Sequence, residues 1–245
     1  KPVKAAFSVL AKRCADEAAL REHLRFRLWE KIIIKRLTWP FRRVSRKHLD
    51  CEIDADCFIA EGCVDDALQV CVDGYAHAGK VNILGTVDSV MYPGTSAFKR
   101  FEYPSRLGAE VVARLEDVAR HAVEAIGFTH GLFNVELFYQ PVADRITIIE
   151  INPRMAGQFS DLYERVDGKS LWSLELDLAL GKTPLFPHRE GKFGAAASFV
   201  FREFGDEVKQ APPVEQQGWL VATYPDARLF LDIKHSTSRA RVMPT

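Results

Sequence analysis

Apolar residues recur at helical spacing between residues 105 and 126. The apolar positions are Leu107, Val111, Leu115, Val118, Ala122 and Ala125. Steps of three and four place these side chains on one face of a helix. Gly127 follows directly and supplies the residue type that ends helices. The stretch is therefore predicted to form an amphipathic helix packed against a core.

Two further stretches have helical patterns. Residues Asp16 and Glu17 open one that runs towards residue 37, where Pro40 is predicted to stop or kink it. Another covers about residues 170–180 and is closed by Gly181 and Pro184.

Shorter apolar stretches bounded by Gly, Pro and Asp predict strands. The predicted strands are residues 58–61, 68–75, 80–87, 131–139, 145–151, 195–201, 219–222 and 228–233. The first strand of the predicted hairpin turns near Asp73 and Gly74, and Gly79 lies in the connection. Residues 91–105 are predicted to be a loop because they contain Pro93, Gly94 and Pro104. Antiparallel hairpins mixed with helices predict an α+β fold and not a doubly wound parallel sheet.

Composition narrows the class of protein. The chain has 245 residues, of which 47% are hydrophobic, so it can bury a sizeable core. Its 33 basic and 33 acidic residues cancel, which gives no reason to expect a nucleic-acid partner. No apolar stretch approaches the roughly 18 residues of a membrane span. The chain begins at Lys1 without an initiator Met, so we expect it to be part of a longer protein.

The cysteines favour a reducing compartment. They are Cys14, Cys51, Cys57, Cys63 and Cys71. Their number is odd and they form no CxxC pair, which favours reduced thiols in a cytoplasmic protein over disulfides or a zinc site.

Basic residues interleave with apolar ones in the first predicted helix and just beyond it, between residues 25 and 47. Trp29, Ile33 and Ile34 alternate there with nine Lys and Arg side chains. A basic amphipathic helix can bind a membrane surface or a partner protein, or it can be a solvated face over a core. The pattern leaves these alternatives open, with the solvated face favoured.

The informative chemistry lies in the hairpin predicted over residues 131–151. Alternate residues of a strand face the same side, so Glu150 and Asn152 project together while Ile149 and Ile151 enter the core. Glu136 lies on the preceding strand. If the two strands pair across their short turn, the three oxygen-bearing side chains converge.

Two carboxylates and an amide oxygen suit magnesium, which keeps its other positions for water and phosphate. Glu136 and Glu150 would repel each other at short range without a cation, so a metal is expected. Arg154 follows the strand after Pro153, where a guanidinium can bind a phosphate. These residues are predicted to form a magnesium and phosphate site.

The sequence Glu150-Ile-Asn-Pro-Arg154, preceded by a strand that bears Glu136, resembles a signature of the ATP-grasp superfamily of carboxylate–amine (or thiol) ligases. The resemblance extends over roughly residues 1–184. It implies two α+β lobes that clamp ATP, with a small β-rich C-terminal extension. The implied regions are a partial small lobe with the basic helix at residues 1–60, a large lobe with the metal site at 61–190, and the extension at 191–245.

The resemblance also implies roles for individual residues. Glu136, Glu150 and Asn152 would hold Mg²⁺, for which Mn²⁺ could substitute, and Arg154 would stabilise the transferring phosphoryl group. The implied ATP-binding residues are Lys1 and Ser8 at the phosphates, Glu61, Gly62, Cys63 and Val64 at the adenine, and Gln69 at the ribose.

The implied reaction is an ATP-dependent ligation. A substrate carboxylate is activated as an acyl phosphate and is joined to an amine or similar nucleophile, with release of ADP and phosphate. The expected partners are therefore small-molecule acids and amines, with no nucleic acid and no membrane, and a homo-oligomer stays open. A Ser-His-Asp mechanism has no support in the sequence.

Two alternatives to this ligation stay open, and one departure from the superfamily pattern bears on both. The loop that covers the phosphates is usually glycine-rich in this superfamily, whereas Lys4-Ala-Ala-Phe-Ser8 has no glycine. This departure, together with the basic helix that carries Trp29, favours the first alternative, a module that binds ATP without turnover. The second alternative is a carboxylation of the biotin-carboxylase type, which the missing glycines and the absence of a biotin-carrier lysine motif disfavour.

Overall fold

The computed structural model describes residues 12–48, 57–202 and 214–229. These residues belong to two compact units. Among the described residues, one unit combines residues 12–48 and 57–63 with residues 214–229, and the other is the continuous stretch 64–202. Each unit is described by itself.

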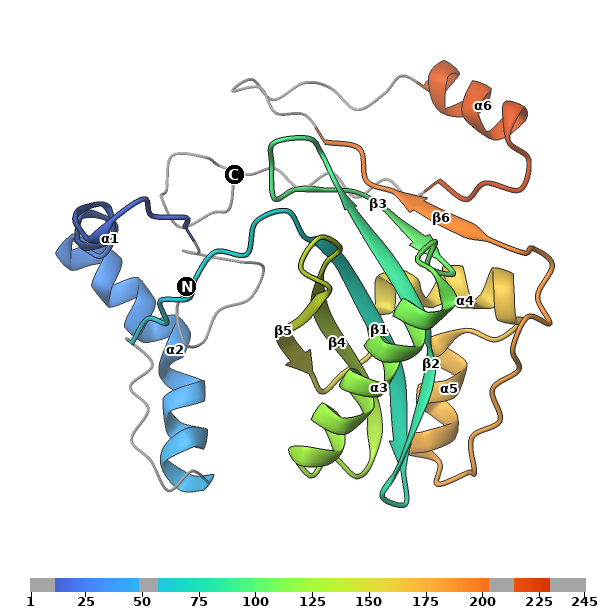
Figure 1. Ribbon diagram of the computed structural model, residues 1–245, viewed down its shortest axis with the longest axis horizontal. Coiled ribbons are helices and arrows are strands. Elements are labelled where there is room, and N and C mark those ends of the chain that lie inside the picture. The colour runs from blue at the N-terminus through green and yellow to red at the C-terminus, as the bar shows by residue number, and fades with distance from the viewer. Residues whose placement is uncertain (1–11, 49–56, 203–213, 230–245) are drawn as a thin grey trace. The chain divides into compact units, whose positions relative to one another are not determined.

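A six-stranded sheet forms the centre of the continuous unit, with the order β5-β4-β1-β2-β3-β6 (Figure 1). The strands are β1 (Leu68–His77), β2 (Lys80–Met91), β3 (Phe98–Tyr103), β4 (Gly131–Gln140), β5 (Arg145–Asn152) and β6 (Ala196–Phe199). All neighbouring strands are antiparallel. The predicted α+β class is therefore confirmed.

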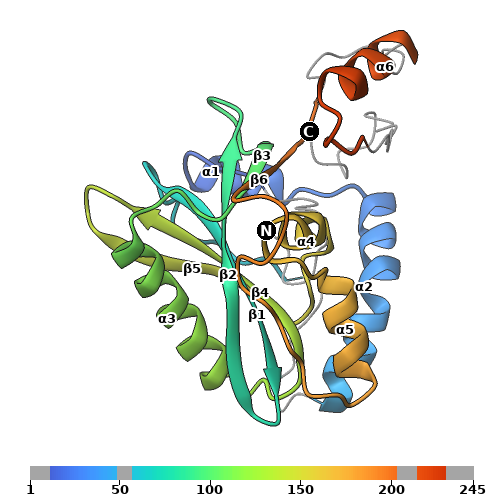
Figure 2. The same ribbon diagram turned by 90° about the vertical axis from the view of Figure 1, so that its right-hand side faces the viewer.

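Helices cover both faces of this sheet (Figure 2). They are α3 (Ala109–Ala125) on one face, and a 3-10 turn η1 (Gly157–Phe159), α4 (Ser160–Asp167) and α5 (Leu171–Ala179) on the other. Leu115 of α3 packs with Val72 and Phe133 in one core. Tyr163 of α4 and Leu174 of α5 belong to the opposite core. The sheet is thus buried on both faces by apolar contacts.

The helices predicted over residues 105–126 and 170–180 are confirmed as α3 and α5. Gly127, with a φ of +69°, follows the end of α3, a conformation that glycine adopts without strain. The hydroxyl of Ser170 accepts a hydrogen bond from the Ser173 N–H at the start of α5, which is a typical N-cap.

The turn predicted near Asp73 and Gly74 is wrong. Strand β1 continues to His77, and the hairpin turns at Ala78 and Gly79, both with positive φ. Asp73 and Gly74 instead mark a β-bulge in the pairing with β2. A Cβ on Gly74 would lie 2.6 Å from the Asn82 carbonyl oxygen, so glycine allows the two strands to approach here.

Strand β3 occupies part of the predicted loop over residues 91–105, so that prediction is wrong for residues 98–103. Phe101 and Tyr103 of this strand are buried and alternate with Arg100 and Glu102. The period-two pattern is only three cycles long and lies between Pro93 and Pro104, so the turn residues are the stronger signal in the sequence.

The other unit contains α1 (Glu17–His23), α2 (Leu28–His48) and α6 (Val214–Thr223). The single helix predicted from residue 16 is therefore two helices, and Pro40 lies inside α2 instead of stopping it. A proline removes one N–H from the helix, and the remaining hydrogen bonds can carry the helix past it.

Residues 219–222, predicted as a strand, are helical in α6. A short apolar stretch such as this one does not distinguish helix from strand. The strand predicted over residues 228–233 falls mostly outside the described residues. Over the described stretches, no helix combines the length and apolar character that a membrane crossing requires.

Candidate functional site

The register between β4 and β5 brings the predicted acidic residues together. Glu136 pairs with Glu150 directly across the two strands, and Asn134 pairs with Asn152. Directly opposite residues point to the same face, here the one that carries η1, α4 and α5. The predicted convergence of Glu136, Glu150 and Asn152 is therefore present in the structure.

Two amide side chains bind the acidic pair. Asn152 Nδ2 donates to Glu150 Oε1 at 3.1 Å and to Glu136 Oε1 at 3.4 Å. Gln69 Nε2, from the neighbouring strand β1, donates to Glu136 Oε2 at 3.0 Å. Glu136 is half-buried, whereas Glu150 is exposed. One carboxylate of the pair is thus fixed by hydrogen bonds, and the other remains open to solvent.

Electrostatics disfavours charge on Glu136. Burial, and then the negative charge of Glu150, raise the pKa of the Glu136 carboxyl, while the nearby Arg154 lowers it. A cation beside both carboxylates would remove the repulsion that contributes to this shift. The described residues hold no group of three or more His, Cys, Asp and Glu side chains that could bind a metal. A cation here would depend on two carboxylates, one amide, water and phosphate, which is a hard-oxygen set suited to Mg²⁺.

Arg154 lies just beyond β5 with its side chain exposed. Its Nη2 donates to Asn152 Oδ1 at 3.4 Å, and its Nη1 donates to the Met155 carbonyl at 3.2 Å. These contacts hold the guanidinium next to the acidic pair. A phosphate could be bound between this guanidinium and a cation on the two carboxylates.

Beside the acidic pair lies a buried polar network that the sequence analysis missed. Asp73 is 1% exposed and accepts hydrogen bonds from Asn134 Nδ2 at 2.9 Å and from the Tyr163 hydroxyl at 3.0 Å. Burial raises the pKa of Asp73 to about 7, although these two hydrogen bonds lower it. In the sequence, Asp73 is a polar residue within the mostly apolar stretch of residues 70–76, and Gly74 beside it makes the pattern typical of a turn.

Cys71 lies on the same face of β1 and is buried. Its Sγ is 3.6 Å from the Ser89 hydroxyl, and burial followed by the charge of Asp73 raises the pKa of the thiol well above its usual value. A thiol in such surroundings is a poor nucleophile. All four cysteines in the described residues, Cys14, Cys57, Cys63 and Cys71, are free.

The remaining predicted ATP-binding residues differ in what the structure describes of them. Lys1 and Ser8 lie outside the described residues. Glu61, Gly62 and Cys63 are exposed and precede the unit that contains the acidic pair, whereas the half-buried Val64 begins it. Of the predicted nucleotide-binding set, Gln69 donates to Glu136 of the acidic pair, and the roles given to the other residues stay predictions.

No protein-family model matches the chain. A stretch of 87 residues is 41% identical to carnosine synthase 1 of Gallus gallus. That stretch is 35% of this chain and 9% of the length of carnosine synthase 1.

Two solved structures share the fold. A biotin carboxylase of Campylobacter jejuni in complex with beta-gamma-ATP has a TM-score of 0.55 and 16% identity, over 75% of this chain and 38% of that one. An L-amino acid ligase of Bacillus licheniformis has a TM-score of 0.51 and 18% identity, over 63% of this chain and 40% of that one. The chain thus spans about two fifths of each neighbour. The resemblance drawn from the Glu-Ile-Asn-Pro-Arg sequence is confirmed at the level of the fold: this chain has the ATP-grasp fold over the part of these neighbours that it covers.

Proposed function

We propose that this chain carries the magnesium and phosphate half of the active site of an ATP-dependent carboxylate–amine ligase. The observation that carries the proposal is the side-by-side arrangement of Glu136, Glu150 and Asn152, with Arg154 bonded to the same amide. Ion pairs that only stabilise a protein join opposite charges, whereas here two like charges face each other across two strands.

Each residue has a distinct task in this proposal. Glu136 and Glu150 would bind Mg²⁺ through carboxylate oxygens. Asn152 donates to both carboxylates now, and an amide that turned about its terminal bond would offer its oxygen to the cation instead. Gln69 keeps the Glu136 carboxylate in place through its hydrogen bond.

Mg²⁺ bound with ATP would neutralise phosphate charge and align the terminal phosphoryl group for transfer to a substrate carboxylate. Arg154 would bind the equatorial oxygens of that group as charge develops on them. The protein contributes positioning and charge neutralisation, and no covalent enzyme intermediate is required.

An amino acid is the substrate class we propose for the nucleophile. The L-amino acid ligase and carnosine synthase 1 are the relatives whose names indicate amino-acid chemistry. The activated acyl phosphate would be attacked by the amino group, which forms a C–N bond and releases phosphate.

The test measures ADP release by the protein as it occurs in cells, with Mg²⁺, ATP and pools of amino acids. We expect release that requires magnesium and an acid–amine pair. Arg154→Ala should lose at least about 100-fold in turnover, as removal of a transition-state donor does, while magnesium-dependent ATP-analogue binding changes by less than about tenfold. Equal loss of binding and turnover would contradict the role given to Arg154.

A module that binds ATP without turnover is the second candidate, and the glycine-free stretch of residues 4–8 favours it. Calorimetry with a non-hydrolysable ATP analogue separates the two functions. Magnesium-dependent binding with no ADP release from any amino-acid pool, and none with bicarbonate, would favour the module. Bicarbonate-dependent release alone would favour carboxylation.

A further inference from the structure

One edge of the sheet is open along part of β2. Residues 80–89 pair with β1 on one side. On the other side β3 pairs only with residues 88–91. Within the described residues, the edge over residues 80–85 therefore has no second strand. An unpaired edge offers main-chain donors and acceptors to an added strand.

Hydrogen bonds at the two ends of this edge show which backbone groups face outward. The Val81 carbonyl accepts from Arg120 Nη1 at 3.4 Å, and the Thr86 carbonyl accepts from the Ser105 N–H at 2.9 Å. Because backbone groups alternate along a strand, the N–H and C=O of Ile83 point to the same edge as those of Val81. Among the described residues, no group forms a hydrogen bond with the outward N–H or C=O of Ile83. They are available to a partner strand.

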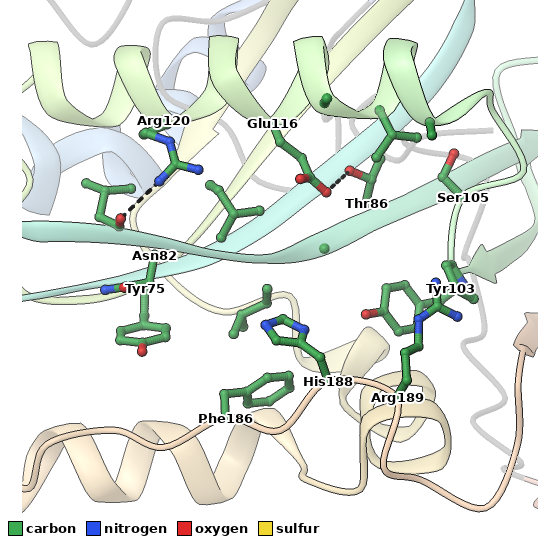
Figure 3. Close-up of a pocket in the computed structure, with 18 of the residues that line it drawn as sticks. Tyr75, Asn82, Thr86, Tyr103, Ser105, Glu116, Arg120, Phe186, His188 and Arg189 are labelled. Carbon is green, nitrogen blue, oxygen red and sulfur yellow. Dashed lines mark hydrogen bonds between the residues drawn. The ribbon is translucent and has the colours of Figure 1, made fainter.

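The open edge lies at the bottom of a groove of about 810 Å³ (Figure 3). Helix α3 forms one wall and residues 186–189 form the other, with β2 between them. Ile83, Val112 and Phe186 are half-buried in its lining. The space between α3 and residues 186–189 leaves this edge of β2 accessible to an added chain.

The charge of the lining selects an acidic occupant. Lys80, Arg120 and Arg189 carry positive charge, whereas Glu116 is the lone carboxylate among the lining residues. Glu116 also accepts a hydrogen bond from the Thr86 hydroxyl at 3.0 Å. Lys80 and Arg189 are exposed, so they can reach a bound chain. Opposite charge would steer and orient an acidic segment.

We propose that this groove, defined by residues 80–86, α3 and residues 186–189, binds an extended acidic segment of a partner protein, which adds a strand to β2. Main-chain hydrogen bonds to Ile83 would supply the pairing, and the apolar walls would take alternate side chains. The groove lies on β2, whereas the acidic pair lies on β4 and β5, so binding here does not depend on the proposed ligase activity.

The probe is a fluorescein-labelled hexapeptide of alternating valine and glutamate, and fluorescence anisotropy with residues 1–245 reports binding. We expect the peptide with lysine in place of glutamate to bind at least about tenfold more weakly. The double variant Lys80→Gln with Arg120→Gln should weaken binding of the acidic peptide by a similar factor. Arg145→Gln removes one charge from the far edge strand β5 and should leave binding unchanged.

Two tests address the strand pairing. Ile83→Pro removes an outward N–H and should weaken binding about three- to tenfold. Because this variant could unfold, the second test keeps the wild-type protein and methylates the peptide nitrogens of either all valines or all glutamates. In an extended peptide, the N–H groups of either the valines or the glutamates face β2, but not both. One methylated peptide should therefore lose binding, and the other should retain it.

Three outcomes would overturn the proposal. Equal binding of the acidic and basic peptides would remove the role of charge, and equal behaviour of the two methylated peptides would exclude strand addition. A chain that dimerises in sedimentation experiments, and whose dimer is dissociated by the peptide, would make a second copy the occupant.

Discussion

Two polar clusters lie on the same face of the sheet, one strand apart. One places two like charges side by side near solvent, whereas the other buries one carboxyl group among hydrogen-bond donors. In the acidic pair, Glu136 and Glu150 face each other, and Glu150 is exposed. In the buried network, Asp73 is enclosed, and Asn134 and Tyr163 donate to its two oxygens. The residue types are similar, but the number of partners and the access of solvent differ.

This difference supports a ligand-binding role for the acidic pair and a structural role for the buried network. A carboxylate that is fully buried, with each oxygen already accepting a hydrogen bond, is closed to ligands from solvent, and its partners hold strands β1 and β4 to α4. A like-charged pair at the surface stabilises nothing by itself, which supports the proposal that it binds a cation. Substitutions in the two clusters should accordingly affect different measurements.

Glu150→Gln should have the largest effect. It keeps the shape of the side chain and removes a charged ligand, so magnesium-dependent binding of an ATP analogue should fall at least about 100-fold. Stability to urea should not decrease, because a repulsion is removed. Calorimetry and urea denaturation measure the two quantities.

Glu124→Gln is the matched control, since Glu124 is exposed on α3, which covers the other face. It should change neither quantity. If Glu150→Gln bound the nucleotide as well as the wild-type chain, the metal site would be wrong.

Asp73→Ala should have the opposite effect to Glu150→Gln, because it should lower the free energy of unfolding. The substitution leaves the Asn134 amide and the Tyr163 hydroxyl buried without their acceptor, which costs about 3 kcal/mol. Asp73→Asn retains the shape and one acceptor and should cost about 1 kcal/mol. Urea denaturation at pH 6 provides the comparison. A loss below 1 kcal/mol in the alanine variant would show that the network does not hold the sheet.

The pH dependence of stability should also distinguish Asp73. Its folded-state pKa of about 7 lies above the ordinary value of 3.8, so the folded protein binds the proton more tightly than the unfolded chain does. The resulting stabilisation is complete below pH 3.8 and is lost as the pH rises to 7, by about 2 kcal/mol between pH 5 and 7. The variant Asp73→Asn should lose this component of the slope. If the dependence of stability on pH were the same in this variant, the pH dependence would come from groups other than Asp73.

The sequence predicted the acidic pair because alternation in two adjacent strands is a local property. Glu136, Glu150 and Asn152 are separated by one short turn, so a hairpin is enough to bring them together. The partners of Asp73 lie 61 and 90 residues further along the chain, and only the complete sheet and α4 bring them near. Such long-range contacts leave no periodic signal.

Strand β3 and the open edge of β2 show the same limit. Turn residues on both sides concealed a strand whose pairing with β2 begins only at residue 88. The groove follows from where that pairing stops, and residues 186–189 complete it from about 100 residues away. Local patterns predict elements, but they do not predict which edges stay uncovered.

Gln69→Ala should have the smallest effect on metal binding. Gln69 lies on the same strand as Asp73 and donates a hydrogen bond to Glu136, so it links the two clusters. Its hydrogen bond lowers the pKa of the Glu136 carboxyl, so removing it should raise that pKa further. Metal binding requires the charged form, and its midpoint in a pH titration with Mn²⁺ should therefore move to higher pH. At neutral pH the loss of affinity for Mn²⁺ should be about three- to tenfold.

Gln140→Ala, at the far end of β4, is the control and should leave the midpoint of the pH titration unchanged. An equal shift in both variants would mean that Gln69 acts through the fold and not through the carboxylate that it touches.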